Sequence, residues 1–305
     1  MSYPWRVALA LFSIGMGSAF GQATASGTIQ GTVFDQTQAV IPGAAVVVTS
    51  KSTGETRTTL TNESGNYRFD LMAAGAYTVK VSQQGFSAVV QNVELLVGQT
   101  ATANATLTPG ATSEVVEVTT QAPLVDLGKT SVSQNITPTE VAELPMVGRD
   151  VANLAYLAPG VKSAMSYDPT KNRYAILSVN GENGRNVNVT INGVDNKDNT
   201  VGGPVMQLPL EAVQEFQIST QRFSAENGRS EGAAVNMITK QGTNAYHGSV
   251  FGFFRDTALN TDEKVPNGDG TSAPQHPDYS RQQFGGSVGG PFIKNRLFGF
   301  FAIER

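Results

Sequence analysis

The chain has 305 residues, enough for about two ordinary domains, and only 15% of its residues are charged, against roughly 25% in an average soluble protein. The 32 glycines and 14 prolines favour short strands and turns, and the formal net charge of −4 argues against nucleic acid as a partner. The absence of cysteine excludes disulfides and cysteine metal sites, and two histidines leave little for zinc or triad chemistry, so we expect neither an enzyme nor a cofactor.

Residues 1–21 have the pattern of a signal peptide. Arg6 precedes an apolar run at residues 7–14, and Ala19 and Gly21 occupy the small-residue positions of a cleavage site. The apolar run is far shorter than the ~20 residues of a membrane-spanning helix. We therefore expect export, and an exported chain that is rich in glycine and free of cysteine fits a bacterial envelope protein.

Residues 27–108 predict a small β-sandwich, because seven short runs suited to strands recur at intervals near ten residues with turn-forming residues between them. The runs are residues 28–34, 44–49, 56–60, 67–69, 76–81, 89–96 and 100–107. This region resembles the carboxypeptidase regulatory-like (transthyretin-like) domain at residues 31–35, 41–44, 61–69 and 75–79. The resemblance covers the accessory sandwich and not the peptidase, because the chain has no His-x-x-Glu zinc pair. It leaves open whether the sandwich docks to something or merely folds.

Residues 109–123 indicate a linker that contains one run of acidic and β-branched residues. The run consists of Glu114, Val115, Val116, Glu117, Val118 and Thr119. It is either an ordinary strand or a segment that adds to the edge of a partner's sheet, where backbone hydrogen bonds supply the affinity.

Residues 124–244 mix short helices and strands. Thr137, Pro138 and Glu140 suit the cap, first position and third position of a helix over 137–144. A second short helix is expected over 149–157, and Glu211 suits a single helical turn. Strands are expected at residues 176–180, 187–192, 213–219 and 232–239.

The last part of the chain, residues 245–305, holds three segments with the length of a tilted transmembrane strand. The segments are residues 246–256, 281–290 and 296–304, and residues 256–280 form a polar loop between the first two. The second segment alternates between two faces, which we interpret as the apolar-out, polar-in pattern of a barrel. One face holds Gln282, Phe284, Gly286, Val288 and Gly290, and the other holds Arg281, Gln283, Gly285, Ser287 and Gly289. Three strands cannot close a barrel, so we expect the chain to be a truncation of a longer protein.

Several motifs of residues 124–244 resemble the plug of a TonB-dependent outer-membrane receptor. They are Leu144-Pro145, Gly148-Arg149, Pro159-Gly160, residues 191–195 and residues 232–244. Residues 246–256 resemble the first barrel strand of that family, and with the sandwich the chain is similar to the Oar-like receptors. The resemblance implies a mainly β fold, with a transthyretin-like β-sandwich, an α+β plug and the first strands of an incomplete transmembrane β-barrel.

The same resemblance implies a receptor in the bacterial cell outer membrane for energy-coupled uptake of a large, unknown solute, with the plug gating the barrel. Residues 114–119 lie where the TonB box of the family lies, which makes TonB and outer-membrane lipid the expected partners. Asn183, Arg185 and Asp195 are candidate solute contacts on plug loops, although solvated turns explain them as well. A calcium loop at residues 195–199 lacks the glycine and glutamate of an EF-hand, so we expect no metal.

A second hypothesis is a soluble periplasmic or cell-surface binding protein built from a β-sandwich and an α/β domain. The feature that discriminates between the two hypotheses is the pair of aromatic runs at residues 251–254 and 297–301, for which a soluble protein has no use. A third class, an enzyme such as a carboxypeptidase, would need a cluster of ligands or nucleophiles that the sequence lacks.

Overall fold

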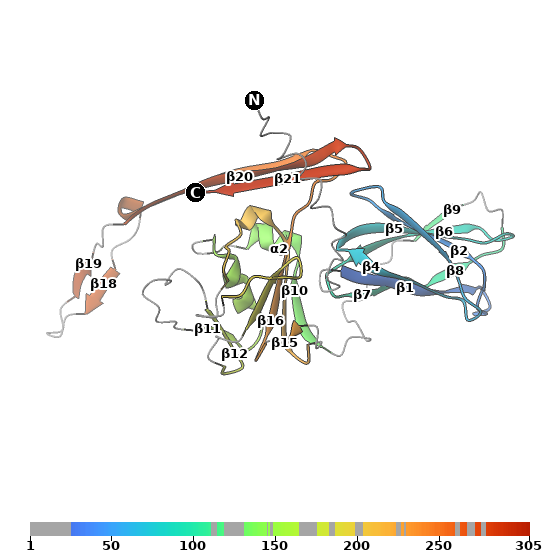
Figure 1. Cartoon of the computed structure of the whole chain (residues 1–305), viewed down its shortest axis with the longest axis horizontal. Coiled ribbons are helices and arrows are strands. Elements are labelled where there is room, and N and C mark those ends of the chain that lie inside the picture. The colour runs from blue at the N-terminus through green and yellow to red at the C-terminus, as the bar shows by residue number, and fades with distance from the viewer. Residues whose placement is uncertain are drawn as a thin grey trace, which may run out of the picture.

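The computed structural model describes residues 26–110, 115–118, 131–144, 146, 149–164, 176–182, 187–198, 204–223, 227–228, 230–259, 263–266, 272–275 and 279–305. The predicted signal peptide lies outside these residues. Figure 1 shows three neighbouring parts: the sandwich, the central plug region (residues 124–244), and the barrel strands (from residue 245), which run across the top of the plug region.

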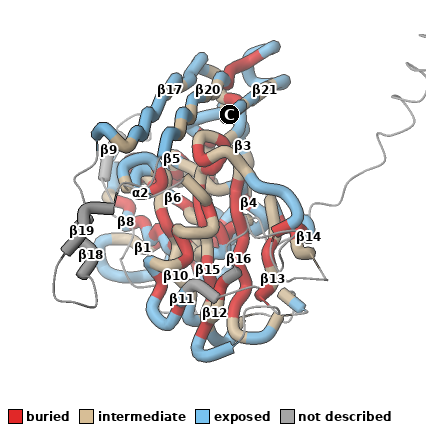
Figure 2. Tube along the Cα trace, turned by 90° about the vertical axis from the view of Figure 1, so that its left-hand side faces the viewer, coloured by how far each residue is buried: buried red, intermediate tan, exposed pale blue. Residues whose placement is uncertain are grey.

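The sandwich consists of two sheets around one apolar core. The first sheet contains β1 (Ser26–Asp35), β4 (Asn66–Ala73), β7 (Thr100–Thr102) and β8 (Ala105–Leu107). The second sheet has the order β3 (Thr56–Leu60), β2 (Ala45–Ser50), β5 (Gly75–Ser82), β6 (Ala88–Leu95) and β9 (Val115–Val118). Buried residues alternate along β1, β2, β5 and β6, and Ile29, Val46 and Val79 are completely buried. Figure 2 shows the buried positions gathered in the interior of the molecule.

The predicted strand at residues 100–107 is wrong as a single element, because it divides into β7 and β8. At the break the carbonyl of Ala103 accepts a hydrogen bond from the Tyr67 hydroxyl, and the Ala103 amide donates to Gln30. The Ala103 oxygen also lies so close to Gly31 that a Cβ on that glycine would sit 2.2 Å from it. These contacts of Ala103 interrupt the regular strand pairing with β1 and separate β7 from β8.

The sandwich is expected to fold without the rest of the chain, because its core is drawn from its own strands and needs no disulfide. A fragment of residues 26–110 should give a single cooperative transition in a thermal melt followed by far-UV circular dichroism. A gradual melt, or the spectrum of a random coil, would contradict this prediction.

The plug region is built on a five-stranded mixed sheet with short helices beside it. The order of the sheet is β10 (Val132–Ile136), β15 (Val213–Gln221), β16 (Ala234–Thr239), β13 (Asn188–Ile191) and β14 (Val194–Asp195). A separate hairpin pairs β11 (Val161–Ala164) with β12 (Ile176–Val179). Phe216 and Ile218 of β15 are completely buried at the centre of this core.

The helix predicted after Thr137 is confirmed as α2 (Pro138–Glu143), with a capping box in which Thr137 and Glu140 bond reciprocally. The second short helix, predicted over 149–157, is present as the 3₁₀ helix η3 (Val151–Leu157), which begins two residues later than predicted. Arg149 has a φ of +55°, outside helical geometry, and the Asp150 side chain caps the helix by accepting from the Ala152 amide.

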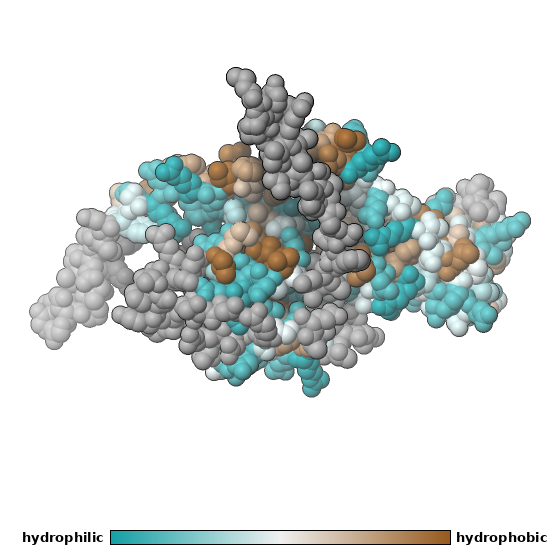
Figure 3. Space-filling view, in the orientation of Figure 1, coloured by the Kyte–Doolittle hydropathy of each residue, from teal (hydrophilic) through white to brown (hydrophobic). Residues whose placement is uncertain are grey.

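The barrel strands form one antiparallel sheet, with the order β17 (His247–Asp256), β20 (Ser280–Ile293) and β21 (Leu297–Glu304). Along β20, Gln282, Phe284 and Val288 are exposed while Arg281, Gln283 and Ser287 are less exposed, as the predicted alternation requires. The alternation ends before Gly290, which is buried although the sequence pattern predicts it on the outward face. Apolar side chains gather in patches over these strands (Figure 3). This three-stranded sheet is open, which is consistent with an incomplete barrel.

The predicted loop at residues 256–280 contains secondary structure of its own. Thr257–Leu259 form the 3₁₀ helix η6, and β18 (Glu263–Pro266) pairs with β19 (Ser272–Gln275) in a short hairpin. Among the helices in the described part of the chain, none is both long and apolar enough to cross a membrane.

Candidate functional site

The side chain of Arg149 joins the plug region to two barrel strands. Its Nη2 lies 2.9 Å from Oε1 of Glu211 in η4 (Leu210–Ala212), and its Nε lies 3.5 Å from Oε1 of Glu304 in β21. The guanidinium carbon lies 4.1 Å from the ring centroid of Phe251 and 5.1 Å from that of Phe253, both in β17. Arg149 thus makes one ion pair within the plug, to Glu211, and one ion pair and two cation–π contacts across the interface with the barrel strands.

This interface is largely shielded from water, with side-chain exposures of 12% for Arg149, 19% for Glu211 and 14% for Glu304. The Ser249 hydroxyl donates to Oε2 of Glu211 at 2.7 Å. Burial by itself raises the pKa of the Glu211 carboxyl, but hydrogen bonds from Ser249 and Arg149, with two nearby positive charges, hold the pKa below its usual value. Glu211 is therefore ionised at neutral pH and stays paired with Arg149.

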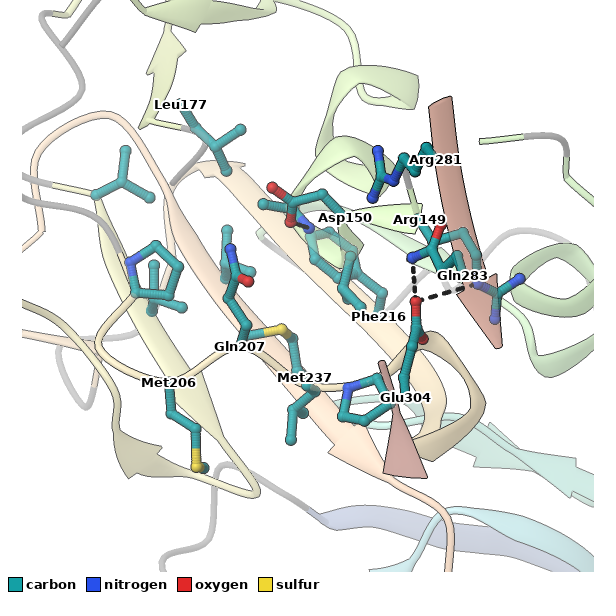
Figure 4. Close-up of a pocket in the computed structure, with 18 residues that line it drawn as sticks. Arg149, Asp150, Leu177, Met206, Gln207, Phe216, Met237, Arg281, Gln283 and Glu304 are labelled. Atoms are coloured by element: carbon teal, nitrogen blue, oxygen red, sulfur yellow. Dashed lines mark hydrogen bonds and ion pairs between the residues drawn. The ribbon is translucent and has the colours of Figure 1, made fainter. Parts of the chain in front are cut away.

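A cavity of about 630 Å³ lies beside these ion pairs, between the plug sheet and the barrel strands. Figure 4 shows the carboxylate of Glu304 bonded to Arg149 and to Gln283 at one end, with apolar side chains farther along. The residues that line it include Asp150, Phe216, Met237 and Gln283. This mixed lining suits a solute or ordered water, and it contains no arrangement of nucleophile and base.

The sandwich is docked on the plug sheet through the loop that follows β6. The amide of Val97 donates to both carboxylate oxygens of Glu215 at 3.1 Å, and its carbonyl accepts from Asn135 Nδ2 and Gln217 Nε2 at 2.9 Å. Glu215 is only 1% exposed and Val97 is completely buried. A buried carboxylate is thereby satisfied across the boundary between the two parts.

A second contact ties the sandwich to the barrel strands. The amide of Asn244, just before β17, donates to the carbonyl of Ser52 in the β2–β3 turn at 2.9 Å. Asn244 and Asn295, in the β20–β21 turn, exchange two hydrogen bonds of 2.7 and 2.8 Å. The sandwich therefore contacts the plug sheet directly and is linked to the barrel turn through Asn244.

The predicted site residues are distributed unevenly. Val115–Val118 form β9, at the edge of the second sandwich sheet, whereas Glu114 and Thr119 lie outside the described residues. Asn183 and Arg185 also lie outside them. Asp195 is exposed in β14, and its Oδ1 accepts from the Lys197 amide at 3.0 Å, as expected of an Asx turn. Its role as a solute contact stays a prediction.

Sequence reasoning missed Glu211 and Glu215 as interface residues and noted Arg149 only as part of a family motif. One signal could have found them. Glu211 and Glu215 flank the start of β15, and a strand that is buried on both faces has no solvated side for a carboxylate, so each acid needs a partner inside the protein. In the ranges that the structure describes, no three His, Cys, Asp or Glu side chains group in a way that could hold a metal ion.

Comparison with known proteins agrees with this architecture. Residues 28–108 match the carboxypeptidase regulatory-like domain, and residues 238–305 match an outer membrane beta barrel domain. The TonB-dependent transporter Oar of Myxococcus xanthus is 32% identical over 298 residues, which are 93% of this chain. The chain is an Oar homologue. It spans 27% of the length of that curated relative.

The homology confirms the predicted resemblance to Oar-like TonB-dependent receptors and supports an outer-membrane location. The relative is a transporter and not an enzyme, and a soluble binding protein is not favoured. Two solved structures are also similar. The siderophore receptor PirA of Acinetobacter baumannii has a TM-score of 0.42 and 21% identity, over 56% of this chain and 24% of its own. The transporter YddB of Escherichia coli has a TM-score of 0.42 and 12% identity, over 53% and 24%.

Proposed function

We propose that the chain supplies the accessory sandwich, the plug and the first barrel strands of a TonB-dependent outer-membrane receptor, which takes up a large solute by energy coupling. The observation that carries this proposal is the interface around Arg149. The ion pair with Glu211 fixes the Arg149 side chain within the plug. The ion pair of Arg149 with Glu304, its contact with the Phe251 ring and the hydrogen bond from Ser249 to Glu211 hold the plug against the wall of the barrel. A plug held in this way blocks the barrel until a force displaces or rearranges it.

The lengths of the connections give the orientation. In outer-membrane barrels the short turns face the periplasm and the long loops face outward. The β20–β21 turn, which contains Asn295, is short, whereas residues 257–279 between β17 and β20 are long. Ser52 of the sandwich bonds to Asn244, and Asn244 bonds to this short turn, which supports a periplasmic position for the sandwich, on the side from which TonB acts.

Residues 114–119 are the proposed TonB box, because they lie between the sandwich and the plug and Val115–Val118 already have strand geometry. A partner strand would pair with their backbone, so backbone changes should matter more than side-chain changes. Asn183, Arg185 and Asp195 remain the proposed solute contacts on the plug loops.

Val116→Pro in the full-length receptor should weaken binding of the purified periplasmic domain of TonB by at least ~10-fold, because proline removes a backbone donor and fixes φ. Val115→Ala leaves the backbone intact and should change binding by less than ~2-fold. Affinities would be measured by calorimetry on detergent-solubilised receptor, with thermal unfolding as a check that both variants fold. Native affinity in the proline variant would refute the assignment of the box.

A further inference from the structure

The segment assigned to TonB is part of the sandwich sheet. The backbone of Val115–Val118 pairs in parallel with β6, with Ala88 opposite Val115 and Gln91 opposite Val118. In the sheet order β9 is the terminal strand, so one of its edges faces β6 and its other edge has no strand beside it among the described residues. A strand with one open edge is a template for another strand.

The chain is led to this position by hydrogen bonds just before it. The amide of Ser87 donates to the carbonyl of Thr108 at 2.9 Å, and the amide of Gly110 donates to that of Gly85 at 3.2 Å. These bonds hold the chain beside the start of β6, and only four residues separate Gly110 from Val115. A tether this short reaches at most about 3.5 Å per residue and keeps the segment at an effective concentration in the millimolar range next to β6.

The platform that carries β9 is itself fixed to the plug. β6 ends at Leu95, and two residues later the amide and carbonyl of Val97 are bound by side chains of the plug sheet, including the buried Glu215. A load on β9 thus passes through the β6 ladder and Val97 into β15. If the box were an unpaired, flexible segment, a pulling force on it would reach the plug only after the segment had been fully extended.

We propose that the open edge of β9 is the docking edge for TonB and that the sandwich presents the box as a preformed strand, so that the strand of the partner extends the sandwich sheet. This inference rests on the proposed function. Residues 114–119 carry two glutamates and no basic residue, so the partner strand that fits best is basic. Presentation of an ordered strand lowers the entropic cost of pairing, which favours binding to the assembled sheet over binding to a free segment.

A reversible crosslink tests the proposal, and residues 1–305 contain no cysteine that would compete in this part of the receptor. The full-length receptor would carry Val90→Cys with Glu117→Cys, whose backbones are register partners. The matched control pairs Thr58→Cys, on β3 at the opposite edge of the same sheet, with Glu117→Cys. Disulfide formation under mild oxidation would be followed by gel mobility, and binding of the purified periplasmic domain of TonB would be measured before and after reduction.

We expect the Val90–Glu117 pair to oxidise at least ~10-fold faster than the control pair, and the oxidised receptor to bind the TonB domain within ~3-fold of the reduced one. Equal oxidation rates would overturn the pairing of β9 with β6. Rapid oxidation with a loss of binding of ~10-fold or more, restored by reductant, would overturn docking on the assembled sheet and show that the box must leave β6. If the unmodified receptor does not bind TonB, the proposed function fails, while the oxidation rates still report the pairing.

Discussion

Arg149→Ala is expected to destabilise the plug together with its contact to the barrel by about 3–5 kcal/mol, because it leaves the carboxylates of Glu211, in the plug, and Glu304, in β21, buried without their cation. The change also removes the cation–π contacts with Phe251 and Phe253. The measurement is thermal unfolding of the detergent-solubilised full-length receptor, together with entry of a large polar antibiotic into cells. A lower melting temperature and higher permeability are expected.

Three control variants separate charge from packing. Arg149→Lys keeps the charge but loses the planar contacts, so an intermediate loss is expected. Combining Arg149→Ala with Glu304→Gln removes one of the two buried carboxylates that the single variant leaves without a cation, so the double variant should be more stable than Arg149→Ala alone. Arg57→Ala breaks an exposed ion pair with Glu55 and should cost at most about 1 kcal/mol. Equal effects of Arg149→Ala and Arg57→Ala would show that the interface does not hold the plug.

Glu215→Ala is expected to release the sandwich from the plug sheet. The substitution leaves the buried amide of Val97 without its acceptor, at a cost of about 1–3 kcal/mol, which is roughly 5–150-fold in the docking equilibrium. Fluorophores on Thr58→Cys in the sandwich and Glu143→Cys in the plug region would report the distance between the two parts. A broad distribution of distances is expected in place of a narrow one.

Glu94→Ala is the matched control, since Glu94 is an exposed glutamate near the end of β6, and it should leave the distance distribution unchanged. Glu215→Gln keeps one acceptor oxygen and should give an intermediate distribution. If Glu215→Ala leaves the distribution narrow, the contact through Ser52 and Asn244 is sufficient to hold the sandwich, and the role given to Glu215 is wrong.

The sequence predicts elements whose signals are local. The strands of the sandwich follow from β-branched alternation and turn residues, α2 from Thr137 and Glu140, and the outer face of β20 from Phe284 and Val288. The start of η3, which differs from the prediction, also has a local cause. Asp150 has the signature of an N-cap, so η3 begins at Val151, two residues after Arg149, whose φ of +55° is not helical.

The candidate site could not be predicted in this way because its members are far apart in the chain. Arg149 meets Glu211 and Glu304 only after the plug and the barrel strands have formed. The Val97 amide of the sandwich donates to Glu215 of the plug sheet. Every residue except proline has such an amide, so the sequence does not indicate which one binds a carboxylate. The parallel pairing of β9 with β6 could not be predicted either, because an acidic, valine-rich segment such as residues 114–119 can pair with the edge strand of many different sheets.

The two attachments of the sandwich have a mechanical consequence beyond simple tension. A domain attached at a single point can rotate about that point, whereas a domain attached at two separate points resists rotation. Val97 meets the plug sheet and Ser52 meets Asn244, which is bonded to the barrel turn at Asn295. A twist applied to the sandwich would therefore be resisted both at the plug sheet and at the barrel turn, because its two attachments lie on different elements.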